Sequence, residues 1–180
     1  YQLNKEIEWE KDKTYVLTQV TEKLAVELKQ VEDIAETISD RRFASRLLTK
    51  LKERNMEYHI HKDYFTSWHK TPEGGYNTGR YLSEFDIDRA RDGIHIFGQV
   101  RLNKSADRKL DFVVLSKKND FIKKFVLECQ TNLGHLKPME NHRDCVLARE
   151  ITLRTDFVFL QYSSREIFWD SNISSMDELI

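Results

Sequence analysis

Cysteine, proline and glycine are scarce in this sequence. The 180 residues include only 2 Cys, 2 Pro and 6 Gly. Two cysteines are too few for a disulfide framework, so we expect both thiols to be reduced. The scarcity of proline and glycine excludes collagen-like repeats and flexible-linker architectures. Because 39% of the residues are hydrophobic, we expect one folded domain, with room in the length for a helical extension.

Long hydrophobic runs and an excess of one charge are also missing. No run approaches the roughly 20 residues of a membrane helix, and no signal-peptide pattern is present. We therefore expect a soluble, intracellular (cytoplasmic) protein with no membrane partner. The net charge is −1, so any contact with nucleic acid requires a local basic patch. Because the sequence begins with Tyr1 rather than methionine, we expect a fragment, a processed chain or part of a longer protein.

The N-terminal region has the composition of a helix. No Gly or Pro occurs between Leu3 and Arg54, and Glu, Lys, Leu and Gln are frequent there. The spacing predicts a helical extension over residues 1–38 that docks on the core, binds another protein or self-associates. Ser39 or Asp40 is expected to cap a second helix. The apolar heptad positions that carry the extension are Leu17, Val20, Leu24, Val31, Ile34 and Ile38.

Residues 39–180 read as an α+β (α/β) core, with an irregular aromatic insertion at about 62–93. Alternating and buried apolar patterns predict strands at 95–102, 109–115 and 125–131, joined as an antiparallel meander. A helix at about 140–149 and a strand at 157–162 should follow, and residues 166–169 are expected to add a short final strand. The expected fold is a central mixed sheet flanked by helices.

Two carboxylates stand out in this sheet. Asp111 lies inside an apolar strand, where an unpaired carboxylate is costly to bury. Glu128 and Gln130 have period-two spacing in the next strand, so they share a face that Cys129 does not. If the strands are neighbours, Asp111 and Glu128 can meet, and a cation between them would relieve their repulsion. Carboxylate oxygens suit Mg²⁺ or Mn²⁺, and such an ion can support phosphodiester hydrolysis.

These residues resemble the PD-(D/E)xK nuclease superfamily, most closely its very-short-patch-repair-like branch. The resemblance covers roughly residues 40–162 and is one of residue type and order. The sequence departs from the family pattern at two positions: Leu110 stands where the family has proline, and Gln130 stands where it has lysine. The matching text is Asp111-Phe112-Val113-Val114-Leu115, Val126-Leu127-Glu128-Cys129-Gln130, His135, and His142-Arg143-Asp144.

The resemblance implies a restriction-endonuclease-like core that binds nucleic acid, DNA by preference, and cleaves it with Mg²⁺ or Mn²⁺. It makes Asp111 and Glu128 metal ligands, Gln130 a positioning group and His135 a catalytic auxiliary. Lys117, Lys118 and Arg143 become candidates for nucleic-acid binding. An acid from the first helix often joins such sites, and here that would be Glu36 or Asp40, although helical periodicity alone predicts that both are solvated.

Three alternatives remain open from the sequence. Because Gln130 cannot carry charge, the domain could be an inactive nuclease-like module that binds nucleic acid or protein in a larger assembly. The N-terminal heptads favour a purely structural oligomerisation domain. Finally, Cys129, His135, His142 and Cys145 are all permitted zinc ligands, although their spacing is not that of a standard finger.

Overall fold

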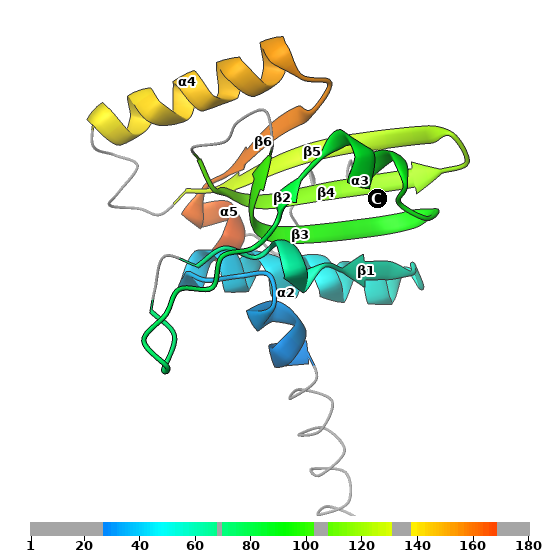
Figure 1. Ribbon diagram of the computed structural model, residues 1–180, viewed down its shortest axis with the longest axis horizontal. Coiled ribbons are helices and arrows are strands. Elements are labelled where there is room, and N and C mark those ends of the chain that lie inside the picture. The colour runs from blue at the N-terminus through cyan, green and yellow to red at the C-terminus, as the bar shows by residue number, and fades with distance from the viewer. Residues whose placement is uncertain (1–26, 68–69, 103–107, 131–137, 169–180) are drawn as a thin grey trace, which may run out of the picture.

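The computed structural model describes residues 27–67, 70–102, 108–130 and 138–168 (Figure 1). In chain order the elements are α2 (Ile38–Glu53), β1 (Tyr58–Ile60), η1 (Lys62–Tyr64), β2 (Tyr81–Leu82), α3 (Glu84–Asp88), β3 (Gly93–Leu102), β4 (Leu110–Lys118), β5 (Phe121–Cys129), α4 (Pro138–Arg154), β6 (Val158–Tyr162) and α5 (Ser164–Phe168).

The described strands form one mixed six-stranded sheet. Its order is β1-β3-β4-β5-β6, and β2 pairs with β3 beside this path. Strands β3, β4 and β5 form the antiparallel meander that the sequence predicts. The pairs β1–β3, β2–β3 and β5–β6 are parallel. The α+β class and the mixed sheet flanked by helices are therefore confirmed.

Helices cover both faces of this sheet, with α2 on one side and α4 on the other (Figure 1). Strand β4 explains how two cores form, because successive side chains leave opposite faces. Phe112 and Val114 pack with α2, whereas Val113 and Leu115 pack in the second core with Leu147 of α4. Burial on both faces accounts for the nearly continuous apolar text of β4.

The chain approaches α2 through a tight crossing over β3. Residues 27–32 are helical, and the helix ends before residue 33. Val31 and Ile34 are buried in the α2-side core, so the described end of the expected extension docks on its own domain. A Cβ at Gly98 would lie 1.7 Å from the backbone oxygen of Ile34, so only glycine permits this crossing. The rest of the extension, residues 1–26, lies outside the described residues.

The helix cap at α2 differs from the sequence prediction. Thr37 is the N-cap, and Asp40 stands three positions later as its partner in a capping box. The Thr37 hydroxyl accepts a hydrogen bond from the Asp40 N–H at 3.2 Å, and the Asp40 carboxylate accepts one from the Thr37 N–H at 3.5 Å. The predicted caps Ser39 and Asp40 therefore lie inside the first turn.

The predicted final strand at 166–169 is also wrong. Residues Ser164–Phe168 form the helix α5. The Ser163 hydroxyl accepts from the Glu166 N–H at 3.3 Å, and the Glu166 carboxylate accepts from the Ser163 N–H at 3.4 Å, which is again a capping box. Arg46 of α2 donates to the carbonyls of Glu166 and Ile167 at 2.8 and 3.0 Å, so tertiary contacts also hold this turn as helix.

Candidate functional site

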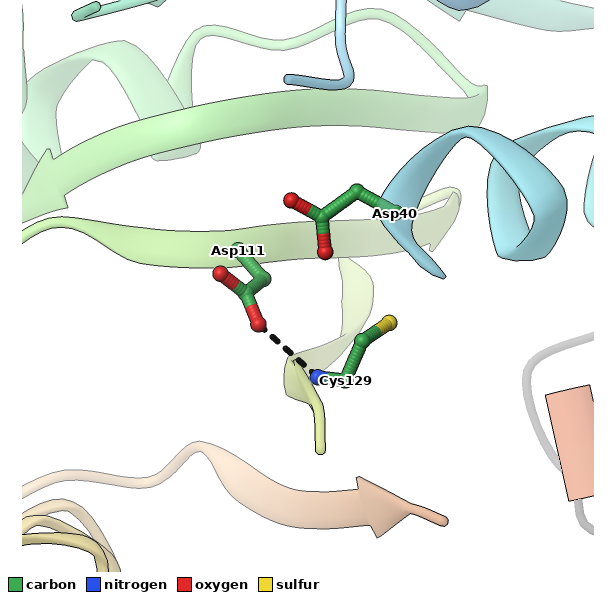
Figure 2. Close-up of side chains that lie close together, drawn as sticks. All are labelled: Asp40, Asp111 and Cys129. Atoms are coloured by element: carbon green, nitrogen blue, oxygen red, sulfur yellow. Dashed lines mark hydrogen bonds between the residues drawn. The ribbon is translucent and has the colours of Figure 1, made fainter. Parts of the chain in front are cut away.

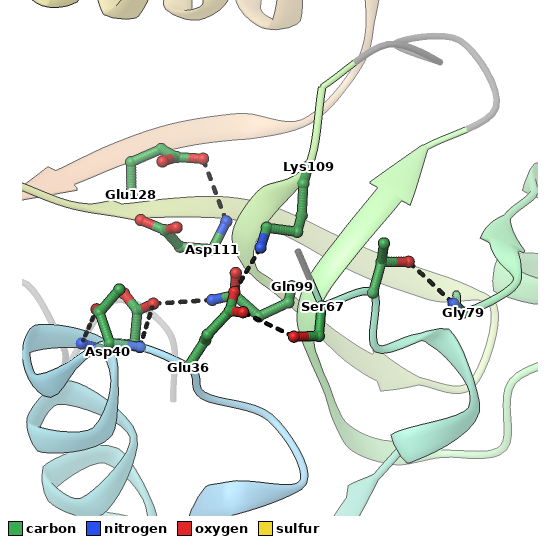
Figure 3. A network of polar contacts seen from close by, with 10 residues as sticks. Glu36, Asp40, Ser67, Gly79, Gln99, Lys109, Asp111 and Glu128 are labelled. Atoms are coloured by element: carbon green, nitrogen blue, oxygen red, sulfur yellow. Dashed lines mark hydrogen bonds and ion pairs between the residues drawn. The ribbon is translucent and has the colours of Figure 1, made fainter. Parts of the chain in front are cut away.

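The carboxylates of Asp111 and Glu128 meet where the β4–β5 ladder ends. The ladder pairs Phe112 with Leu127, and its register continues to Asp111 beside Glu128. Beyond the Phe112–Leu127 pair, side-chain carboxylates accept the hydrogen bonds that backbone carbonyls accept in the rest of the ladder. Glu128 Oε1 accepts from the Asp111 N–H at 3.3 Å (Figure 3), and Asp111 Oδ2 accepts from the Cys129 N–H at 2.8 Å (Figure 2). The two acids from adjacent strands are therefore neighbours.

A third acid, Asp40, reaches the same place from the first turn of α2. Ligand atoms of Asp40, Asp111 and Cys129 all lie within 4.8 Å of one another (Figure 2). Asp40 is only 2% exposed, so its expected solvation is wrong. The sequence did carry a signal for its position, since Thr37-Ile38-Ser39-Asp40 has the spacing of a capping box. The fold thus gathers acids from one helix and two strands.

Burial dominates the electrostatics of this cluster. Burial and the negative charge of Asp111 together raise the pKa of Asp40 to about 7, although hydrogen bonds from Thr37 and Gln99 oppose the shift. Burial also raises the pKa of Glu128 to about 7, although hydrogen bonds with Asp111 oppose the shift. The pKa of the Cys129 thiol is raised well above its usual value, mainly by burial. The thiol is therefore protonated at neutral pH, and the carboxylates share the proton or cation that neutralises them.

Gln99 holds Asp40 in place and was not predicted from the sequence. Its amide Nε2 donates to Asp40 Oδ2 at 2.8 Å, and Gln99 is 2% exposed. Its backbone φ is 50°, in the left-handed region that a non-glycine residue seldom adopts inside a strand. The Thr66 N–H donates to the Gln99 carbonyl at 2.8 Å and helps to hold this conformation. Strained backbone of this kind is concentrated at functional sites.

Beside these acids, Glu36 takes part in an ion pair. Lys109 Nζ lies 2.5 Å from Glu36 Oε2, and each side chain is 11% exposed. The Ser67 hydroxyl donates to the other Glu36 oxygen at 2.8 Å (Figure 3). The expected solvation of Glu36 is therefore wrong as well. Lys109 precedes Asp111 by two residues, so this strand end carries both a cation and an acid.

The proposed lysines lie elsewhere. Lys117 and Lys118 are at the hairpin end of β4, and the six residue-to-residue steps from Asp111 to Lys117 span roughly 20 Å of extended strand. Lys117 Nζ donates to the carbonyls of Asp88 and Ala90 at 2.9 and 2.7 Å, which ties it to the end of α3. The fold therefore does not bring these two lysines beside the acids.

The other candidates are distributed around the acid cluster. The Gln130 N–H donates to the Tyr162 carbonyl at 2.9 Å, which fixes its backbone directly after β5. Arg143 is exposed on α4, and its carbonyl accepts from Arg108 at 3.2 Å. Arg108 in turn lowers the pKa of Glu128 through its positive charge, although burial dominates that pKa. His135 lies outside the described residues.

The structure separates the two cysteines of the alternative zinc set. Cys129 is 3% exposed and belongs to the α2-side core. Cys145 is exposed on α4, which covers the opposite face of the sheet. The position of Cys129 agrees with a packed thiol rather than with a ligand shared with Cys145. His135 and the side chain of His142 are outside the described parts.

Comparisons with known proteins add no identification. Family models, curated proteins and solved structures were searched, and none matches this chain significantly. Within the described residues, no helix has both the length and the apolar character needed to cross a bilayer. The residues of the site are therefore the basis for proposing a function.

Proposed function

We propose that this chain is a metal-dependent nuclease with a restriction-endonuclease-like core, which hydrolyses phosphodiester bonds in DNA using Mg²⁺ or Mn²⁺. The observation that carries the proposal is the acidic group around half-buried Asp111: its carboxylate and that of buried Asp40 have oxygens within 4.8 Å of one another, and its N–H donates to the buried Glu128 carboxylate. Burying several carboxylates together is unfavourable unless a cation or protons neutralise them. Because the fold keeps these carboxylates together, the arrangement favours a functional role in binding a cation.

The order of the elements supports the same proposal. Helix α2 precedes the β3–β4–β5 meander, and α4 and the parallel strand β6 follow. Asp111 is on the middle strand of the meander, and Glu128 is near the end of its third strand. This is the order that the resemblance to PD-(D/E)xK nucleases requires. Asp40 adds the acid that the first helix contributes in many such sites.

Each residue then has a chemical role. Asp111 and Glu128 would hold the ion through carboxylate oxygens, which hard divalent cations prefer. When bound, the ion would lower the pKa of a water molecule and neutralise charge on the scissile phosphate. Gln99 would orient Asp40, since its amide donates to that carboxylate. Gln130 would position water or phosphate as a neutral hydrogen-bonding group.

The test is nicking of supercoiled plasmid DNA with Mg²⁺ or Mn²⁺. We expect Asp111→Asn and Glu128→Gln each to reduce the rate by at least 100-fold, an effect on the order of 3 kcal/mol in transition-state stabilisation. Asp120→Asn is the matched control, because Asp120 is exposed in the turn at the other end of the same hairpin. Equal rates in the parent and all three variants would reject the assigned roles.

A second candidate is an inactive nuclease-like module that binds nucleic acid or a protein partner. Gln130, in the position where the family has lysine, favours it because an amide cannot act as a base or a cation. The nicking assay on the parent chain separates the two functions. Under the first proposal the parent already nicks DNA, whereas a module that retains affinity would bind DNA or a partner without nicking and without needing a divalent ion.

A further inference from the structure

Three histidines gather on strands β1 and β3, away from the acid cluster. The parallel register pairs His59 with His95, and His61 follows directly after β1. The His95 ring centroid lies 5.0 Å from that of His59 and 5.1 Å from that of His61. Phe97 also packs against this group, because its ring stacks on the His61 ring with the two centroids 4.5 Å apart. Two neighbouring strands therefore hold three imidazoles in one group.

Hydrogen bonds define which nitrogens are available. His95 Nε2 is 2.7 Å from the Arg91 carbonyl, which can only accept, so this nitrogen carries the proton. His95 Nδ1 is then an acceptor, and His61 Nε2 lies 2.8 Å from it. Metal-binding histidines usually donate their second ring N–H to a carbonyl or carboxylate in this way, because that bond fixes both tautomer and ring orientation. The contact with Arg91 thus prepares Nδ1 of His95 as a ligand.

The charge state of the pair also suits a metal ligand. Burial, together with the neighbouring His95 and His59, lowers the pKa of His61 to about 4. Burial lowers the pKa of His95 as well, although its hydrogen bond to the Arg91 carbonyl opposes the change. Both rings are therefore neutral at pH 7, as coordination requires.

We propose that His61 Nε2 and His95 Nδ1, together with His59, form a binding site for a borderline divalent ion such as Zn²⁺. In a tetrahedral site with Zn–N bonds of about 2.0–2.1 Å, two ligand nitrogens stand roughly 3.3–3.4 Å apart. The present separation of 2.8 Å needs to increase by only about half an ångström. Because His61 Nε2 is the donor in this hydrogen bond, its proton moves to His61 Nδ1 by exchange with water, and the two freed lone pairs then bind the ion in place of the hydrogen bond.

His59 supplies the third ligand after a side-chain rotation. Among the described residues, Asp40, Asp111 and Cys129 form the one group of three whose ligand atoms all lie within 4.8 Å, so a nitrogen of His59 must move inward. His59 is partly exposed, at 34%, and its Nε2 is 3.7 Å from the Glu57 carboxylate. This leaves it freer to rotate than buried His95. Water can fill the fourth position, as in sites with three protein ligands.

This site is separate from the proposed nuclease centre in position and chemistry. His95 and Gln99 are four positions apart on β3, roughly 13 Å of extended chain. Imidazole nitrogens suit zinc, nickel and copper, whereas the acid cluster offers the oxygens that suit magnesium and manganese. The inference therefore stands or fails independently of DNA cleavage.

The experiment is a titration of the metal-free 180-residue chain, without a polyhistidine tag, using Co²⁺ as a spectroscopic probe and Zn²⁺ in competition. We expect one visible-absorbing Co²⁺ site that Zn²⁺ displaces. His61→Gln and His95→Gln should each weaken Co²⁺ affinity by at least about tenfold, the lower limit found even for outer-sphere partners of a metal. Asp120→Asn and His142→Gln are the controls and should leave the affinity unchanged.

The spectra distinguish the competing sites. Coordination by imidazoles gives ligand-field bands without the sulfur-to-metal charge-transfer absorption that ligation by Cys129 or Cys145 would produce. Circular dichroism shows whether each variant is folded, and His59→Gln, at a partly exposed position, gives a second reading if His95→Gln unfolds. Absence of Co²⁺ binding, thiolate absorption, or equal affinity in folded His61→Gln and the parent would overturn the proposal.

Discussion

Replacing Asp40 with asparagine should stabilise the metal-free protein, and more strongly as the pH rises. Asp40 is 2% exposed, and its pKa is raised from 3.8 to about 7 by burial and by Asp111. A carboxyl whose pKa is raised by folding contributes most at low pH, and the contribution is lost as the pH rises through 7. At pH 8 the folded chain must bury a charge that water solvates freely in the unfolded chain.

The magnitude follows from the two pKa values. Each pKa unit corresponds to about 1.4 kcal/mol, so the buried carboxyl costs the folded state about 4 kcal/mol at pH 8 but only about 2 kcal/mol at pH 5. The asparagine of the Asp40→Asn variant carries no charge and has no such penalty. It loses part of the hydrogen bonding with Gln99 and Thr37, about 1 kcal/mol that does not depend on pH. The free energy of unfolding of Asp40→Asn, relative to the parent, should therefore increase by about 2–3 kcal/mol from pH 5 to pH 8.

Urea denaturation in EDTA at the two pH values measures this difference. Asp120→Asn, at an exposed turn position, should show no pH-dependent difference from the parent. Addition of Mn²⁺ at pH 8 should stabilise the parent more than Asp40→Asn, because a bound ion stabilises only the state that binds it. A pH-independent effect of Asp40→Asn, or a loss of stability that grows with pH, would refute the assignment of Asp40 to a buried, charge-strained cluster.

Two further predictions test the fold and the histidine group. Gly98→Ala should lower the free energy of unfolding by more than about 3 kcal/mol or displace the crossing segment, because its Cβ would lie 1.7 Å from the Ile34 backbone oxygen. Urea denaturation and a crystal structure of the variant check this prediction. A variant that is as stable as the parent and shows no displacement would contradict it. The pKa of His61 is lowered to about 4, so its contribution to stability is present above pH 6.5 and is lost as the pH falls toward 4. Between pH 7 and pH 5 in EDTA, the free energy of unfolding of the parent should fall by about 1 kcal/mol more than that of His61→Gln, after discounting for solvent screening. Equal losses in the two proteins would contradict the prediction.

The sequence was sufficient to predict the central strands because their patterns are set by burial. Strand β4 is apolar on both faces, and the polar turns on either side delimit it. The neighbouring positions of Asp111 and Glu128 follow from hairpin register, which period-two alternation largely determines. The end of the chain was harder, because residues 166–168 are too few for a periodic signal and a Ser163–Glu166 capping box makes them helical.

The missed parts of the site depend on tertiary contacts. Asp40 and Glu36 lie on a face that helical periodicity assigns to solvent, but the crossing at Gly98 brings that segment over the strand ends. Gln99 adopts a left-handed backbone conformation that no local pattern signals. The partner of His95 is likewise set by the parallel pairing of β1 with β3, two strands far apart in the sequence. Such non-local contacts are the least accessible to pattern reasoning.

The most direct test of the nuclease proposal is a crystal structure with Mn²⁺, located by anomalous scattering. The account predicts one peak at the β4–β5 strand end, about 2.1 Å from carboxylate oxygens of Asp111 and Glu128, and its loss in Asp111→Asn. An occupied Mn²⁺ site elsewhere, with no peak beside these two carboxylates, would contradict it.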